Sequence, residues 1–110
     1  MSEPLDDALL TELREVMGGA FATLVETFIA DGERRLDEVA CASVDDALRR
    51  SAHALKGASA NLGAVRLAAA CGVLESLARS GEREGRPAAL ARVQAEFTVA
   101  RDALRRYASA

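Results

Sequence analysis

The spacing of the apolar residues restricts the fold of this chain more than any other feature. Apolar side chains recur at intervals of three and four over most of the 110 residues, which is the period of one face of an α-helix. The most regular case is the C-terminal part, where they occupy positions 90, 93, 97, 100, 104 and 107. Strands have little support, because no segment alternates and only 4% of the residues are aromatic. We therefore expect an all-α fold.

Glycine- and proline-containing breaks divide this pattern into five segments. We expect helices at about residues 5–17, 19–41, 44–61, 64–80 and 87–107, each with one apolar face. Val16 and Val44 fall on these faces, and Ser43 is the candidate N-cap of the third helix. Short connections favour antiparallel neighbours. The sequence thus predicts an antiparallel four-helix bundle with an additional short N-terminal helix, as one domain over residues 1–110.

The bulk composition excludes several classes of protein. The net charge of −3 argues against a general nucleic-acid binder. No apolar run is long enough to span a membrane, and the N-terminus lacks the pattern of a secretory signal. Cys41 and Cys71 lie too far apart for a CxxC motif, so we interpret both as buried free thiols. We expect a cytoplasmic monomer that binds neither nucleic acid nor membranes.

The only histidine and the only lysine lie three residues apart in the third predicted helix. On a helical wheel His53 is about 160° from Leu55, so its imidazole points away from the core. An exposed neutral imidazole keeps a ring nitrogen free to act as a nucleophile. Lys56 supplies a flexible positive charge that suits a phosphoryl group. A lone surface histidine is usually only solvated, and it is the combination on one face that favours phosphoryl transfer.

Small and basic residues surround this pair. Gly57 lies inside the helix, where glycine costs about 1 kcal/mol relative to alanine. Its missing side chain leaves a flat place beside His53 where another protein could approach, and Ala60 keeps the same face low. A basic rim that faces an acidic partner could be formed by Arg49, Arg50, Arg79 and Arg83. For each arginine taken singly, an ordinary solvated helix residue is the favoured interpretation.

The run HALKGASANLGA, from His53 to Ala64, resembles the signature of the histidine phosphotransfer (HPt) domain family. The resemblance extends over nearly the whole chain, most clearly residues 24–81. Flanking matches occur in the second predicted helix, before the histidine and in the fourth predicted helix: Leu24, Val25, Phe28, Asp46, Leu48, Cys71, Leu74, Glu75, Ala78 and Arg79. It implies a four-helix bundle whose exposed histidine carries phosphate in a two-component phosphorelay.

The resemblance also implies roles for single residues. His53 would receive a phosphoryl group on Nε2 from an aspartate of a receiver domain, or pass it to one. Lys56 would neutralise the phosphoryl oxygens, and Gly57 would let the receiver approach. Glu75 would orient the imidazole through its other nitrogen, although an ordinary exposed helix acid is an equal alternative.

The partner implied is the receiver domain of a response regulator, of a hybrid sensor histidine kinase, or both. We expect no cofactor on this protein and a Mg²⁺ ion on the receiver. The sequence has no Gly-rich nucleotide-binding motif, so we expect a phosphoryl carrier and not an enzyme that uses ATP.

The same residues also fit two other kinds of protein. A non-catalytic four-helix interaction module could bind and block a receiver or kinase without carrying phosphate, although blocking alone needs no nucleophile. The chain could instead be a phosphoacceptor domain cut from a larger chemotaxis-type or hybrid kinase. Its start at Met1 and its end soon after the last predicted helix favour a stand-alone protein.

Overall fold

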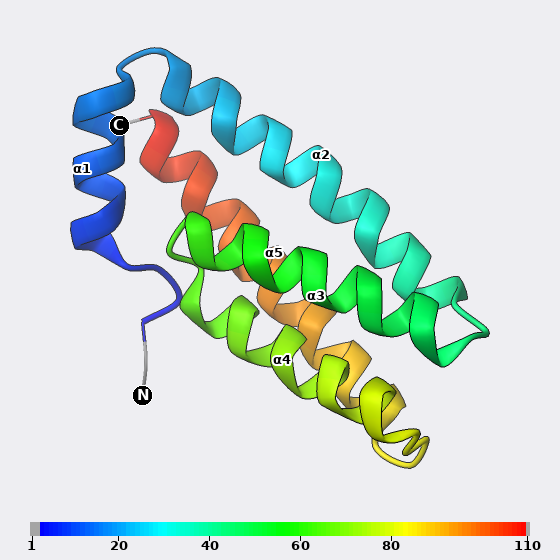
Figure 1. Ribbon diagram of the computed structural model, residues 1–110. Helices are drawn as coiled ribbons and strands as arrows, with labels where there is room; N and C mark the ends of the chain where they lie inside the picture. Colours follow the sequence, from blue (N-terminus) through cyan, green and yellow to red (C-terminus); the bar gives the residue numbers. More distant parts are fainter. Residues whose placement is uncertain (1–2, 110) are drawn as a thin grey trace.

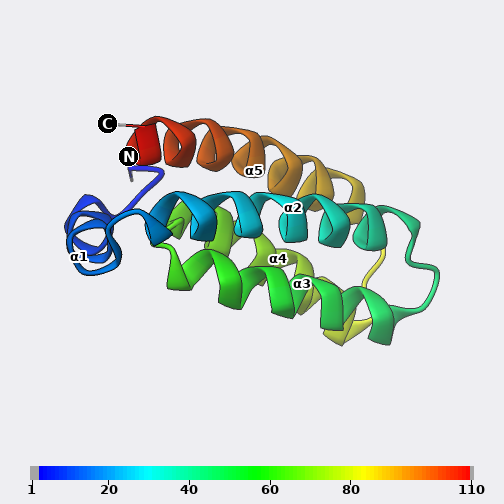
Figure 2. The same ribbon diagram turned by 90° about the horizontal axis from the view of Figure 1, so that it is seen from above.

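The computed structural model describes residues 3–109, and these form five α-helices and no strand (Figure 1). Their bounds are α1 Asp7–Met17, α2 Ala20–Cys41, α3 Asp45–Asn61, α4 Val65–Ser80 and α5 Arg86–Ser109. The four long helices form an antiparallel bundle, in which α2 and α4 each pack against both α3 and α5. Figure 2 shows α1 lying across one end of this bundle. The predicted fold class is confirmed.

The predicted apolar faces of α4 and α5 form much of the core. Leu67, Cys71, Leu74 and Ala78 of α4 are buried, as are Val93, Phe97, Ala100 and Leu104 of α5. From α3 the core receives Leu48, Ala52 and Leu55. Removing such apolar side chains from water contributes about 1.5–3 kcal/mol for each large one, which offsets the entropy lost on folding. Across the described residues, no helix has the length and apolar character needed to cross a membrane.

A glycine in the middle of α2 makes room for an aromatic ring of α5. A Cβ atom at Gly32 would lie 2.3 Å from Cε1 of Phe97, well inside van der Waals contact. The same ring packs against Phe28, with 6.1 Å between the ring centroids. Close packing of α2 against α5 therefore requires glycine at this position.

The predicted core is wrong at the edges of the bundle. Val16 is 79% exposed, because α1 crosses only one end of the bundle and buries Leu10 instead. Val44 is also exposed, since it precedes the first turn of α3 in the connection from α2. Cys41, the last residue of α2, is an exposed free thiol, whereas Cys71 is buried as predicted.

The predicted cap of α3 is also wrong. The N-cap residue is Val44 and not Ser43, and no side chain caps this end. Two acids in the first turn, Asp45 and Asp46, stand near the free backbone N–H groups, where negative charge is favourable. The other end of α3 stops where Gly63 takes a left-handed conformation, with φ at 68°. The N–H of Asp6 donates to the carbonyl of Gly63 at 2.8 Å, which ties the chain before α1 to this turn.

Candidate functional site

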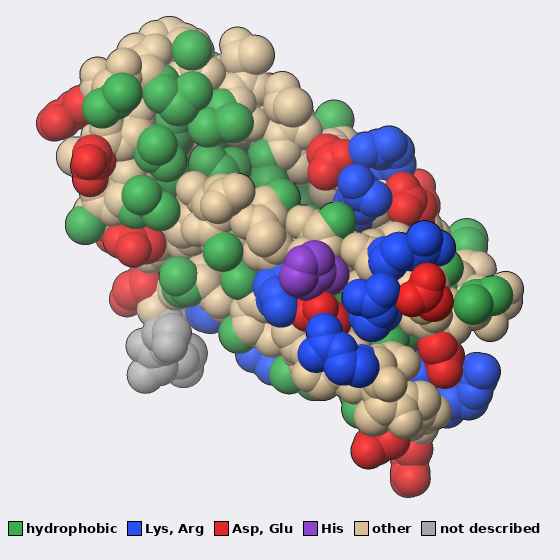
Figure 3. Space-filling view, viewed as in Figure 1, with side chains coloured by type: hydrophobic (Ala, Val, Ile, Leu, Met, Phe, Trp, Pro, Cys, Tyr) green, Lys and Arg blue, Asp and Glu red, His purple; other side chains and the backbone are tan. Residues whose placement is uncertain are grey.

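His53 lies on the outer surface where α3 and α4 run side by side. Figure 3 shows lysine and arginine side chains on both sides of the imidazole and below it, with an acidic side chain between them. Its side chain is 64% exposed, so the predicted exposure of the ring is confirmed. The buried residues Leu48 and Leu55 lie on the opposite side of the helix and fix its rotation.

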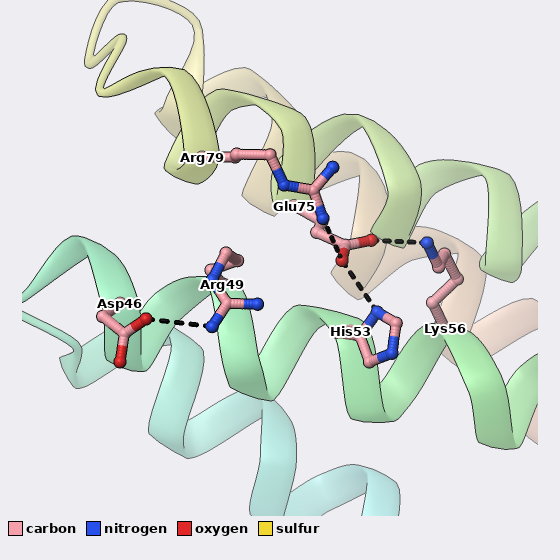
Figure 4. Close-up of polar contacts among 6 residues, drawn as sticks. All are labelled: Asp46, Arg49, His53, Lys56, Glu75 and Arg79. Atoms are coloured by element: carbon pink, nitrogen blue, oxygen red, sulfur yellow. Dashed lines mark hydrogen bonds and ion pairs between the residues drawn. The ribbon is translucent and has the colours of Figure 1, made fainter.

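A buried carboxylate from α4 joins the site together (Figure 4). Only 2% of the Glu75 side chain is exposed. Its Oε2 atom lies 2.7 Å from Nδ1 of His53 and accepts from Nη2 of Arg79 at 3.0 Å. Its Oε1 atom accepts from Nζ of Lys56 at 2.5 Å. Three side chains thus converge on one carboxylate, and the alternative that Glu75 is an ordinary exposed helix acid is wrong.

These contacts determine the charge of Glu75 and the tautomer of the ring. The hydrogen bond from Lys56 lowers the pKa of Glu75, and the one from His53 adds to this effect, while burial opposes both. Glu75 is therefore ionised at neutral pH and can only accept hydrogen bonds. A neutral His53 must then carry its proton on Nδ1, which leaves the lone pair on Nε2. Nε2 faces away from Glu75 in Figure 4.

The exposed residues next to the imidazole on α3 have small side chains or none. Apart from its chain neighbours and the backbone of its own helix, nothing lies within 4 Å of the place where a Cβ on Gly57 would be, so the position is open to solvent. Ala60, one turn further along, is exposed as well. The flat place expected beside His53 is therefore present. Ser59 does not belong to this exposed surface, because it is fully buried and its hydroxyl donates to the carbonyl of Leu55 at 2.6 Å.

Two arginines of the predicted basic rim, Arg49 and Arg79, have different surroundings. Arg79 reaches Glu75 and so joins the contacts of His53. Arg49 instead donates to Asp46 at 2.9 Å, near the start of α3, as Figure 4 shows. The structure therefore brings His53, Lys56, Glu75 and Arg79 into one cluster and leaves Arg49 one turn outside it.

Sequence reasoning missed the sharing of one carboxylate by the histidine and the lysine. The sequence does indicate one contact of this cluster, because Glu75 and Arg79 are four residues apart and can pair on one helix.

The thiol of Cys71, which lies near the cluster, is a poor second nucleophile, because burial raises its pKa to about 12. Within the described part of the chain, no three His, Cys, Asp or Glu side chains are grouped to hold a metal ion.

Comparisons with known proteins agree with this geometry. The sequence model of the Hpt domain matches residues 23–104. Histidine-containing phosphotransfer protein B (HptB) from Pseudomonas aeruginosa superposes with a TM-score of 0.93 at 38% identity, covering 99% of this chain and 97% of that one. The histidine-containing phosphotransfer protein ZmHP2 from maize gives a TM-score of 0.80 at 28% identity, with 90% and 79% covered. No curated protein sequence matches the chain. The chain belongs to the Hpt domain family.

Proposed function

We propose that this protein carries a phosphoryl group on Nε2 of His53 and exchanges it with an aspartate of a receiver domain in a two-component phosphorelay. One observation carries the assignment: the exposed ring is held at Nδ1 by a buried carboxylate, so that its basic nitrogen faces solvent. Membership of the Hpt domain family, whose proteins are phosphotransfer carriers, supports the same function.

The exchange needs one bond to form and one to break. The lone pair of Nε2 attacks the phosphorus of an aspartyl phosphate, the Nε2–P bond forms, and the P–O bond breaks to release the aspartate carboxylate. Positive charge develops on the imidazole during this step, because Nδ1 keeps its proton. The Glu75 carboxylate at 2.7 Å stabilises that charge. The reverse transfer follows the same path.

The remaining parts of the site position and neutralise the phosphoryl group. Phosphoryl transfer depends on in-line placement and on compensation of the oxygen charges. Lys56 has a flexible stem whose ammonium group can reach those oxygens. We propose that the receiver binds the Mg²⁺ ion and that this protein has no cofactor and no ATP site of its own. The phosphoryl group would then come from a kinase through a receiver.

The receiver is proposed to dock over the part of α3 that has only small exposed side chains. Gly57 and Ala60 leave its backbone open to close approach. Figure 3 shows hydrophobic side chains gathered over α1 and the adjoining part of α2, on the same face as the imidazole. Arg49 and Arg79 stand on the other side of His53, where they can meet acidic side chains of the receiver.

We also propose that the protein works as a cytoplasmic monomer. Its two cysteines are free thiols, which suits a reducing compartment. Sedimentation equilibrium of the purified chain should give the mass of one copy, and a mass of two copies would contradict the monomer.

The function is tested with receiver domains of the source organism that have been charged with labelled acetyl phosphate. Label should move from a cognate receiver to wild-type protein and not to His53→Gln. Lys56→Ala should slow this transfer by about tenfold or more without a change in helicity. Equal labelling of His53→Gln would refute the assignment. If no phosphohistidine forms and His53→Ala inhibits the receiver as well as wild type does, the chain is a blocking module.

A further inference from the structure

The ammonium group of Lys56 does not lie beside Nε2 of His53, the atom that is proposed to carry the phosphoryl group. The ammonium group lies at Oε1 of Glu75, on the α4 side of the ring, whereas Nε2 of His53 faces away from Glu75 (Figure 4). A phosphoryl group on Nε2 would therefore stand on the far side of the ring from Glu75. Lys56 has to leave the carboxylate, at least in part, in order to neutralise that group.

The surroundings of Lys56 allow this movement. Its side chain is 38% exposed. The stem passes over Gly72 of α4, where an added Cβ would lie 3.7 Å from Cδ of the lysine, so no α4 side chain fills that place. A lysine stem with four rotatable bonds can then change partners at low cost.

Departure of Lys56 creates a problem at Glu75. This carboxylate is 2% exposed, and a buried charge without a compensating partner is strongly unfavourable. Burial alone would favour its neutral form, so the carboxylate would take the Nδ1 proton of His53 and lose the negative charge that stabilises the ring. Within the described residues, Glu75 pairs with His53, Lys56 and Arg79, and of these only Arg79 is a permanent cation besides Lys56.

We propose that Arg79 is a positioning residue, which stays on Glu75 and holds the carboxylate against His53 while Lys56 moves from Glu75 to the phosphoryl group. Phosphorylation of His53, as proposed above, is a condition of this role. Arg79 suits it because it lies four residues after Glu75 on the same helix, the favourable order for such a pair. Its guanidinium is always charged and presents several donors, so it can serve either carboxylate oxygen.

The test requires a phosphoryl donor that makes no protein contacts, since Arg79 is 63% exposed and also stands where a receiver could touch it. Phosphoramidate meets this need. Nε2 attacks its phosphorus, the Nε2–P bond forms, and the P–N bond of the nitrogen-protonated donor breaks to release ammonia. The rate of phosphohistidine formation in the full chain is followed by ³¹P NMR and intact mass.

Five variants separate the possible roles of Arg79. Arg79→Ala should slow phosphorylation by phosphoramidate about 3- to 10-fold, and Arg79→Lys should recover part of the loss. In a Lys56→Ala background, Arg79→Ala should slow the reaction by a larger factor than it does in wild type, because neither Lys56 nor Arg79 is then left on Glu75. The matched control is Arg105→Ala, which removes the arginine of an exposed Arg–Glu pair between α5 and α2, with 3.1 Å from Nε to Oε2 of Glu26. That control should react at the wild-type rate.

Two results would overturn the inference. A wild-type rate of Arg79→Ala with phosphoramidate, together with slow transfer from a receiver, would make Arg79 a docking residue only. Fully additive losses in the Lys56→Ala, Arg79→Ala double variant would make it an independent phosphoryl ligand. If Arg79→Ala does not fold, Arg79→Gln and Arg79→Lys give the same comparison. The proposed function fails separately, when no receiver exchanges phosphate with a His53 that phosphoramidate can label.

Discussion

Gly57 offers a prediction in which stability and function change in opposite directions. It lies in the interior of α3, and nothing outside its own helix stands within 4 Å of the position of an added Cβ. Gly57→Ala therefore meets no clash and gains helix propensity of about 1 kcal/mol, and Gly57→Gln gains about half of that. For a chain of this length, 1 kcal/mol corresponds to a rise in Tm of about 4 °C. A residue selected only for folding would not be glycine here.

The cost should be visible only when a receiver is present. Gly57→Gln places a long side chain beside His53, so we expect transfer from a charged receiver to fall by about tenfold or more, while labelling by phosphoramidate stays at the wild-type rate. Thermal unfolding followed by circular dichroism gives the Tm, and single-turnover transfer gives the rate. Ala95→Gln, an exposed change on α5, is the control for both. A lower Tm in Gly57→Ala would refute the open-space reasoning, and normal receiver transfer in Gly57→Gln would refute the docking reasoning.

Other predictions concern packing, charge and thiol reactivity. Gly32→Ala should lower the free energy of unfolding in urea by about 1–3 kcal/mol, because the new methyl group overlaps the ring of Phe97; an unchanged midpoint would contradict this packing. The lowered pKa of Glu75 means that its ionised form stabilises the fold above the unfolded value of about 4.3, and that this contribution is lost as the pH falls through the lower folded value. The stability difference between wild type and Glu75→Gln should therefore shrink between pH 7 and pH 3, and a constant difference would count against the ion pair. Native protein at pH 8 should show one thiol reactive toward Ellman's reagent, Cys41, because Cys71 is buried with a pKa of about 12. Two reactive thiols would show that α4 opens.

The long helices were predictable because each packs along its whole length against two neighbours. In α5, the spacing of Val93, Phe97 and Leu104 therefore corresponds directly to burial. The same rule fails for Val16, since α1 contacts the bundle at one end only and most of its surface has no neighbour. It also says nothing of Gly32, which in the sequence only interrupts an apolar row. Its reason lies in a ring that reaches it from another helix.

The site likewise has some features that depend on one helix and others that depend on how two helices pack. The exposure of His53 and its proximity to Lys56 are properties of one helix, so the spacing of three residues was enough to place both on the outer face. The apolar face of α4 fixes the rotation of that helix, but the contacts that bury the Glu75 carboxylate come from α3, and no periodicity within α4 specifies them. The packed site nevertheless explains why an acid is tolerated there, because each carboxylate oxygen receives its own cation. The nucleophile therefore belongs to α3 alone. The charge that orients its ring and stabilises it during transfer exists only once α4 has packed beside it, which makes the α3–α4 interface the part of this bundle where folding and function depend on the same contacts.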